Sequence, residues 1–262
     1  MSLNLNQIQK LAEKLVLNAG DILLKHKGKA VIKKYKKEQD FVTNVDLLIE
    51  KQTIALIEKQ YPDHNILSEE IGEINKGSNY TWIIDPLDGT KEYIRNMILY
   101  CSAVSLQNKT DILTSAIYHP PVKELYSASR NNGAFLNGKK NKVSNQNKLK
   151  NSMLFGYLSK GKNSWKKLNL INQKSYRLRT HANHNLSYCW IAKGGYEAHI
   201  NLNSLQKWWD IAPGILILQE AGGKVTDEEN NNITPQNKSK FIIASNGKIH
   251  QQLLKLVNRK NI

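Results

Sequence analysis

The sequence has few cysteines, no long apolar run and no recognisable targeting segment. Its two cysteines, Cys101 and Cys189, lie in mainly apolar stretches, so they provide no disulfide framework and no metal-ligand spacing. The longest apolar runs, such as Ile211–Leu218, fall short of the roughly 20 residues that span a bilayer. The N-terminal segment mixes polar and apolar residues and has no small-residue cleavage site. We therefore expect a cytoplasmic protein with no membrane partner.

Acidic residues are scarce relative to basic ones. The chain has 38 Lys and Arg against 22 Asp and Glu, a net charge of +16. A basic cluster that would attract polyanions comprises Lys33, Lys34, Lys36 and Lys37. No RNA-binding aromatic signature, zinc-finger spacing or basic heptad segment accompanies it, and abundant Lys, Asn and Ile are equally typical of AT-rich coding DNA. We predict no dedicated nucleic-acid partner, and the charge also fits phosphorylated small molecules.

Apolar periodicity predicts helices and strands in alternation along the first half of the chain. Helical spacing marks residues 8–22 and 47–57, joined by an extended stretch that ends at Asp46. Short strands are predicted at 65–70 and 80–85. From residue 101 to 144 the alternation favours an antiparallel sheet, with hairpins at Asn132–Gly133 and Asn137–Gly138.

The second half of the chain has a different pattern of predicted elements. It predicts strands at 152–159, 176–180 and 198–202, and helices at 187–195 and 210–223 that end in glycine pairs. Mixed elements throughout indicate a layered α/β or α+β architecture. We expect two halves, residues 1–150 with most of the candidate site and 151–262 with the rest, divided in the polar segment 148–152.

The segment WIIDPLDGTKEY, Trp82–Tyr93, places two aspartates three residues apart around a proline. One interpretation is a turn, because Asp, Pro and Gly are common where a strand stops and reverses. The other is a metal site, with Asp85 and Asp88 fixed by Pro86. The amides of Gly89 and Thr90 would then open a helix over residues 90–95, and a helix N-terminus can seat a phosphate.

Further acidic residues occur where predicted elements end, and sites are often built at such ends. They are Asp46, Glu69, Glu70 and Asp210. Each has a structural alternative, since Asp46 and Asp210 could be helix N-caps and the glutamates could lie on a solvated loop. Together, carboxylates without a His or Cys cluster favour Mg²⁺ or Mn²⁺ over zinc. Two such ions could stabilise both oxygens of a phosphoryl transfer.

These motifs also carry a resemblance. DPLDGTKEY, with LSEE and FVTNVD upstream and WWDIAPGILILQEAGG downstream, resembles the inositol monophosphatase superfamily in order and approximate spacing over nearly the whole chain. The resemblance implies an αβαβα sandwich, a usually homodimeric, Mg²⁺-dependent and lithium-sensitive phosphomonoesterase, and a small phosphorylated metabolite as partner. It implies metal ligands at Glu69, Asp85, the Leu87 carbonyl, Asp88 and Asp210.

The resemblance also assigns roles in catalysis. It implies that Asp46 and Thr90, with Glu69, orient the attacking water, and that the amides of Gly89 and Thr90 contact phosphate. Asp88 and Asp210 would also contact the substrate, whereas Glu70 is not expected to be a ligand. Chemically, a metal lowers the pKa of water and a threonine hydroxyl can relay the proton. His119, between Tyr118 and Pro120, is interpreted as a turn residue and not as a base.

The substrate is ambiguous in the sequence. Lys91-Glu92 after the threonine is similar to 3′(2′),5′-bisphosphate nucleotidases, which makes 3′-phosphoadenosine 5′-phosphate the leading prediction. Other stretches, such as YPDHNILSEEIG and GAFLNGKK, are closer to inositol monophosphatases, and a sugar or histidinol phosphatase is a further alternative. A regulatory or RNA-associated member of the family is the non-enzymatic alternative.

The predicted substrate wall departs from both groups. The segment Ala182–Ser187, ANHNLS, stands where a Gly-Ser-Ala-Ala or Gly-Ser-Ser stretch is usual, and Asn203 stands where inositol enzymes have a glutamate. Asn183, His184 and Asn185 are therefore candidate contacts to a different substrate, with a repacked loop as the alternative. Such changes can alter specificity strongly, because a hydrogen-bonding site rejects analogues that lack the matching group.

Overall fold

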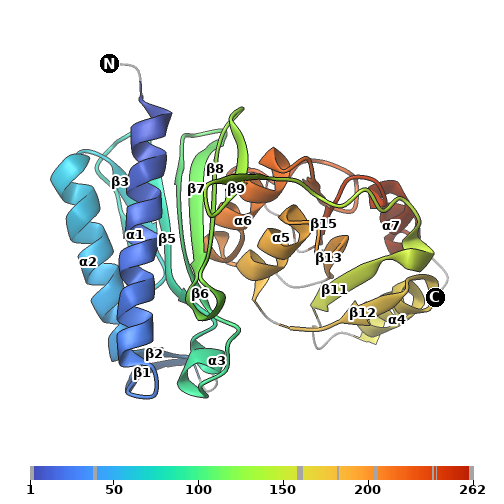
Figure 1. Ribbon diagram of the computed structural model, residues 1–262, viewed down its shortest axis with the longest axis horizontal. Coiled ribbons are helices and arrows are strands. Elements are labelled where there is room, and N and C mark those ends of the chain that lie inside the picture. Colours follow the sequence, from blue (N-terminus) through green and yellow to red (C-terminus); the bar gives the residue numbers. More distant parts are fainter. Residues whose placement is uncertain are drawn as a thin grey trace.

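The computed structural model has five layers (Figure 1) and describes residues 3–37, 40–157, 162–181, 183–202, 206–237, 239 and 241–259. Asn203 lies outside the described residues. The helices are α1 (Leu5–His26), α2 (Asn44–Gln60), α3 (Thr90–Ile94), α4 (Lys162–Lys174), α5 (His184–Ala192), α6 (Trp208–Glu220) and α7 (His250–Val257), and 3-10 turns span Pro120–Val122 and Leu149–Asn151. Within this part of the chain, no helix is both long enough and apolar enough to cross a membrane.

The strands form a hairpin and two sheets. The hairpin pairs β1 (Ile32–Lys37) with β2 (Asp40–Thr43). The larger sheet has the order β10-β9-β8-β7-β6-β5-β3-β4, with β3 (Asn65–Ser68), β4 (Gly72–Ile74), β5 (Thr81–Asp88), β6 (Cys101–Gln107), β7 (Ile112–His119), β8 (Glu124–Ser129), β9 (Gly133–Leu136) and β10 (Lys139–Asn141). The smaller sheet has the order β12-β11-β13-β15-β14, with β11 (Met153–Tyr157), β12 (Arg177–Arg179), β13 (Ala198–Asn201), β14 (Lys224–Thr226) and β15 (Ile242–Ser245).

The eight-stranded sheet is buried on both faces because its strands are apolar on both sides. On β5, Trp82 and Ile84 pack with α1 and α2, whereas Ile83 packs with α5 and α6 on the opposite face. This follows from the two-residue period of a strand. Figure 1 shows α1 and α2 as the outer layer and α5 and α6 between the two sheets.

The five-stranded sheet completes the sandwich. Its inner face shares a core with α5 and α6 through residues such as Val225 and Ala244. Its outer face packs on α4 and α7, where Leu168 and Leu253 are buried. The expected αβαβα layering is therefore confirmed. Because the middle helices pack on both sheets, the division of the chain into halves at residue 150 stays a prediction.

Several local predictions are confirmed and others need correction. Asn137 and Gly138 have φ of 49° and 76° and connect β9 to β10, as a two-residue hairpin requires. Helix α5 begins at His184, three residues before the predicted start at Ser187. Residues 184–187 therefore form the first turn of a helix and not the repacked loop considered as an alternative, and Ala182 lies outside the described residues. The sequence analysis missed α4 and α7, although the apolar residues of α7, such as Leu253, Leu254 and Val257, recur at helical spacing.

Candidate active site

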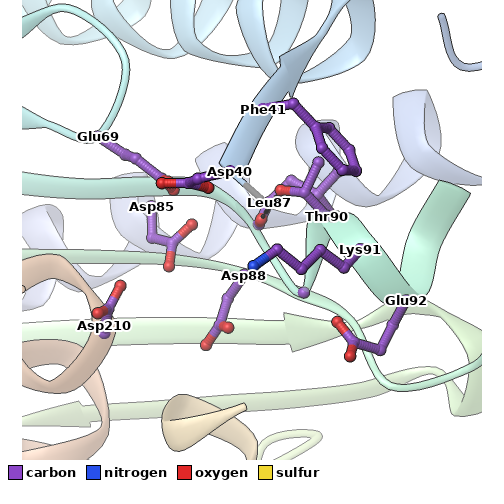
Figure 2. A pocket seen from close by; sticks show the side chains of 11 residues that line it. Asp40, Phe41, Glu69, Asp85, Leu87, Asp88, Thr90, Lys91, Glu92 and Asp210 are labelled. Atoms are coloured by element: carbon purple, nitrogen blue, oxygen red, sulfur yellow. Dashed lines mark hydrogen bonds between the residues drawn. The ribbon is translucent and has the colours of Figure 1, made fainter. Parts of the chain in front are cut away.

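One pocket gathers most of the acidic residues singled out in the sequence (Figure 2). It has a volume of about 150 Å³ and lies beside the end of β5, the start of α3, strand β2 and the start of α6. The residues that line it are Asp40, Phe41, Glu69, Asp85, Leu87, Asp88, Gly89, Thr90, Lys91, Glu92 and Asp210. Side chains from both halves of the sequence therefore meet in one place.

Asp85 and Asp88 are placed by a bulge, which corrects the prediction of a turn. Both belong to β5, and the pairing with β6 shifts register between them, from Asp85↔Ala103 to Asp88↔Cys101. Residues three apart on a regular strand face opposite sides, but one extra residue in a bulge re-aims the side chain that follows. Pro86 is tolerated there because a bulge spares it the ladder hydrogen bond. Both carboxylates therefore line the same pocket.

Asp46 and Asp210 have the same local setting on two different helices. Each is the third residue of its helix, not the N-cap that the sequence suggested as an alternative. The Oδ2 of Asp46 accepts a hydrogen bond from the Thr43 amide, and the Oδ2 of Asp210 accepts one from the Lys207 amide, both at 3.0 Å. Because the helix start fixes one oxygen of each carboxylate, the side-chain orientation is set before any ligand binds.

Thr90 connects Asp46 to the pocket. Its hydroxyl lies 3.0 Å from the Oδ1 of Asp46 and 3.0 Å from the Leu87 carbonyl oxygen. Asp46 is fully buried and does not line the pocket, whereas Thr90 does. Burial raises the pKa of the Asp46 carboxyl. The pair therefore offers a hydroxyl at the pocket surface with a basic carboxylate behind it.

Gly89 makes the turn between β5 and α3. Its φ is 95°, and a Cβ at this position would lie 2.4 Å from the carbonyl oxygen of Leu99. Glycine is therefore required both for the left-handed backbone and for the close approach of a second chain segment. This turn places the Gly89 and Thr90 amides at the pocket, although α3 is only five residues long.

We expect Gly89→Ala to destabilise the protein by more than the ~1–2 kcal/mol of left-handed strain alone, because the methyl group would clash with the backbone carbonyl of Leu99. The variant should also release less phosphate. Urea unfolding and a phosphate assay measure the two effects. Gly77→Ala is the matched control, since Gly77 has a φ of +75° but no heavy atom near the added methyl. Equal losses of stability in the two variants would contradict this account of Gly89.

Glu69 forms an ion pair with Lys36, and hydrogen bonds to Glu50 fix the backbone that follows Glu69. The ammonium of Lys36 lies 2.9 Å from Glu69 Oε1 and 2.7 Å from Glu70 Oε1. Buried Glu50, one turn after Asp46, accepts hydrogen bonds from the Ser68 hydroxyl and from the amides of Glu70 and Ile71, at 3.0 and 3.2 Å for the amides. The orientation of Glu69 therefore depends on residues that the sequence did not single out for it.

Burial, reinforced by mutual repulsion, makes the ionised carboxylates of the pocket unfavourable. Burial, and then the charge of Glu69, raise the pKa of Asp210 to about 7. Burial and neighbouring carboxylates also raise the pKa values of Asp85 and Asp88 well above the usual range. Lys36 opposes this effect at Glu69, but burial still raises the pKa of that carboxyl. A cation bound among these groups would relieve the repulsion.

The donor set fits a hard divalent cation. All of the candidate donors are oxygens, as Mg²⁺ prefers, and the buried Oδ1 of Asp85 has no hydrogen-bond partner. As they stand, no three His, Cys, Asp or Glu side chains in the described part of the chain are close enough together to hold a metal ion. Binding therefore requires side-chain movements toward a common centre.

The predicted substrate wall lies beneath the pocket. Asn183, His184 and Asn185 are buried and are not among the lining residues. The side-chain amide of Asn183 donates to the Asp88 carbonyl at 3.1 Å, and that of Asn185 to the Asp88 carboxylate at 3.1 Å. His184 instead faces His199, with ring nitrogens 3.0 Å apart. Direct contact of these three side chains with substrate stays a prediction.

Sequence reasoning missed two lining residues, Asp40 and Phe41 of β2, and also Lys36. Lys91 and Glu92, in the first turn of α3, were singled out only as a signature of the substrate class. Lys36 was identified only as part of a basic cluster, although Lys33 and Lys34 are exposed and Lys36 is not. The signal that distinguishes Lys36 is its position on the hairpin, which no local pattern reveals.

The chain is similar to known proteins over almost its whole length. The model of the inositol monophosphatase family matches residues 4–261. A fructose-1,6-bisphosphatase/inositol-1-monophosphatase from Aquifex aeolicus is 33% identical, over 85% of this chain and 86% of its own length. A putative Nus factor SuhB from Neisseria meningitidis is 32% identical, over 97% of this chain and 99% of its own.

A solved structure is also similar to this chain. An IMPase/NADP phosphatase complexed with Mg²⁺ and phosphate has a TM-score of 0.86 and 28% identity, with 98% of this chain and 97% of that chain covered. The predicted resemblance and fold are thus confirmed. Since the family model spans almost every residue, the chain belongs to the inositol monophosphatase family of phosphatases.

Proposed function

We propose that this phosphatase is a Mg²⁺-dependent phosphomonoesterase that hydrolyses a small polyol or sugar phosphate. The observation that carries the proposal is the single pocket in which Glu69, Asp85, Asp88 and Asp210 lie beside Thr90 and the Gly89 turn. These are the parts that ester hydrolysis needs: cation ligands, a proton acceptor and phosphate-binding amides.

Mg²⁺ would be held by the carboxylates of Glu69, Asp85, Asp88 and Asp210 and by the Leu87 carbonyl, with Mn²⁺ as an alternative ion. When bound, the ion would lower the pKa of a water molecule and offset charge on the phosphate. The buried, unpartnered Oδ1 of Asp85 and the mutual repulsion among the carboxylates support this assignment.

Thr90 and Asp46 supply the route for a proton. The Thr90 hydroxyl is within hydrogen-bonding distance of Asp46, so it can pass a proton to that carboxylate as it accepts one from water in the pocket. Burial raises the pKa of Asp46, which makes its carboxylate a stronger base. Glu69 also lines the pocket and orients the water, and the Gly89 and Thr90 amides hold the phosphate oxygens.

The pocket favours a small ester with one phosphate. Its volume of about 150 Å³ is below the roughly 300–1,000 Å³ typical for drug-sized ligands. Among its described lining residues, Lys91 is the only cation, so a second phosphate gains little attraction there. The Aquifex aeolicus relative is named both as an inositol-1-monophosphatase, whose ester has one phosphate, and as a fructose-1,6-bisphosphatase, whose ester has two. 3′-Phosphoadenosine 5′-phosphate remains the competing substrate, supported by Lys91-Glu92 and by Phe41, whose ring could stack on a base.

A substrate panel tests the proposal. Phosphate release is measured with Mg²⁺ from inositol 1-phosphate, fructose 1,6-bisphosphate, histidinol phosphate and 3′-phosphoadenosine 5′-phosphate, with EDTA and lithium as controls. We expect turnover of inositol 1-phosphate at the highest kcat/KM and loss of turnover in EDTA. Preference for the nucleotide would replace the substrate class, and no Mg²⁺-dependent turnover of any ester would contradict the proposal.

A regulatory function associated with RNA is the second candidate. One observation favours it, the 32% identity to a putative Nus factor SuhB over nearly the full length of both chains. The net charge of +16 is compatible with it. Salt-sensitive RNA binding without Mg²⁺-dependent turnover would support this function over the first. A homodimer in the cytoplasm is expected for either function, and gel filtration with light scattering tests the dimer.

A further inference from the structure

Helix α6, which carries Asp210 at its start, contains a proline inside the helix. Pro213 is the sixth residue of α6 and has no amide hydrogen, so it cannot donate to the carbonyl four residues earlier. That carbonyl belongs to Trp209, the residue before Asp210. Without another donor, a carbonyl in the first turn of α6 would lose its hydrogen bond beside the pocket.

The side chain of Asn185 supplies the missing hydrogen-bond donor. Its Nδ2 donates to the Trp209 carbonyl at 3.3 Å, and its Oδ1 accepts from the Gly214 amide at 3.2 Å. The orientation of the amide group is unambiguous, because a carbonyl can only accept and a backbone amide can only donate. Asn185 is fully buried, so water cannot take over either contact.

The second hydrogen on Nδ2 is directed at the pocket. It is donated to the Asp88 Oδ2 at 3.1 Å, a charge-assisted bond when that carboxylate is ionised. One side chain on α5 thus contacts the last carboxylate of β5 and the helix turn that carries Asp210. The two acids lie on different elements and are 122 residues apart in the chain, from 88 to 210.

We propose that Asn185 is a positioning residue that replaces the hydrogen bond lost at Pro213 and thereby fixes Asp88 relative to the start of α6. The inference rests on the proposed function, in which Asp88 and Asp210 hold Mg²⁺. It also gives a role to the unusual ANHNLS segment, which the sequence suggested as a wall of the substrate pocket. Asn185 lies under the pocket floor, where its side-chain bonds reach Asp88 and the first turn of α6.

The test is a double-mutant cycle with two measurements, Mg²⁺ affinity by calorimetry without substrate and stability by urea unfolding in EDTA. Asn185→Ala should weaken Mg²⁺ binding by about 10- to 100-fold, the range for residues that orient metal ligands. Pro213→Ala restores an amide hydrogen for the Trp209 carbonyl. In that background, Asn185→Ala should shift the urea midpoint by less than half as much, while the loss of Mg²⁺ affinity persists.

Asn246→Ala is the control, because Asn246 is also buried and donates to Ser144 and Gln146 away from the pocket. It should lower the urea midpoint and leave Mg²⁺ affinity unchanged. The double variant keeps the test usable if Asn185→Ala alone fails to fold. Unchanged Mg²⁺ affinity in folded Asn185→Ala, or equal midpoint shifts in both backgrounds, would overturn the inference. If the wild-type protein binds no Mg²⁺, the proposed function fails instead, and the midpoint shifts still decide the role of Asn185.

Discussion

Asp88→Asn is expected to lower Mg²⁺-dependent phosphate release by at least about 100-fold, the scale of losing one key electrostatic contact at a reaction centre. The amide keeps the shape of the carboxylate, and its oxygen can still accept the hydrogen bond from Asn185. What disappears is the negative charge that would hold the cation. The effect should therefore fall on catalysis and metal affinity and not on the fold.

The same variant should melt at a higher temperature than the wild type in EDTA. Burial and the neighbouring Asp210 raise the pKa of Asp88 well above its usual range, so the ionised carboxylate is unfavourable in the metal-free protein. Replacing it with a neutral amide removes that cost. Gain of stability together with loss of activity is the pattern of a functional carboxylate, whereas a structural one would lose both.

Asp111→Asn is the matched control. Asp111 is more than half exposed and pairs with Arg130 at 3.5 Å, a surface contact of little energetic value. Phosphate release and thermal stability should stay close to wild type in this variant. If Asp88→Asn also retains most of its activity, Asp88 has no part in the mechanism.

The sequence predicted which acidic residues form the site better than it predicted the local backbone structure that positions them. The acids Asp46, Glu69, Asp85, Asp88 and Asp210 each follow a recognisable apolar element. The chain pattern therefore indicates a possible site, and the resemblance to the family selects Glu69 over Glu70. The bulge at Pro86–Leu87 could not be predicted, because Asp-Pro and Asp-Gly pairs are equally typical of turns. Whether such a segment turns or continues as a bulged strand depends on pairing with β6, which lies beyond the motif.

Long-range contacts explain the remaining differences. Lys36 resembles Lys33 and Lys34 in every local respect, and only the placement of the β1–β2 hairpin brings its ammonium to Glu69. Asn185 is a predicted substrate contact because the segment ANHNLS departs from the usual pattern of the family. Its side chain also bonds to β5 and α6, and no spacing within the segment reveals these contacts. Helix α4 was missed because its buried face is built from few apolar residues, among them Leu168 and Ile171.

Mg²⁺ is expected to raise the melting temperature by several degrees, and by more at pH 8 than at pH 5. Binding at 100 times the dissociation constant contributes about 2.7 kcal/mol, which corresponds to roughly 5–10 °C for a chain of this size. The pH dependence follows from the carboxylates. They must lose their protons to hold the ion, and Asp210, with its pKa raised to about 7, still carries one at pH 5.

In the metal-free protein, the carboxylates make stability change with pH in the opposite direction. Because the folded-state pKa of Asp210 is raised, the folded protein binds more protons than the unfolded chain between about pH 4 and pH 7. This contribution to the free energy of unfolding is fully present below that window and is lost as the pH rises through it. Asp85 and Asp88 add to the loss, since their pKa values are also raised.

Buried histidines act against this trend, so the metal effect must be measured as a difference. Burial lowers the pKa of His184 to about 3 and that of His181 to about 4. Their contribution to the stability of the folded protein is therefore lost as the pH falls below about 6.5. They contribute equally with and without Mg²⁺. Melting temperatures taken in Mg²⁺ minus those taken in EDTA, from pH 5 to pH 8, therefore isolate the carboxylates. A difference that stays constant with pH would place Mg²⁺ away from Asp210, whereas a rising difference that disappears in Asp88→Asn would place it among these acids.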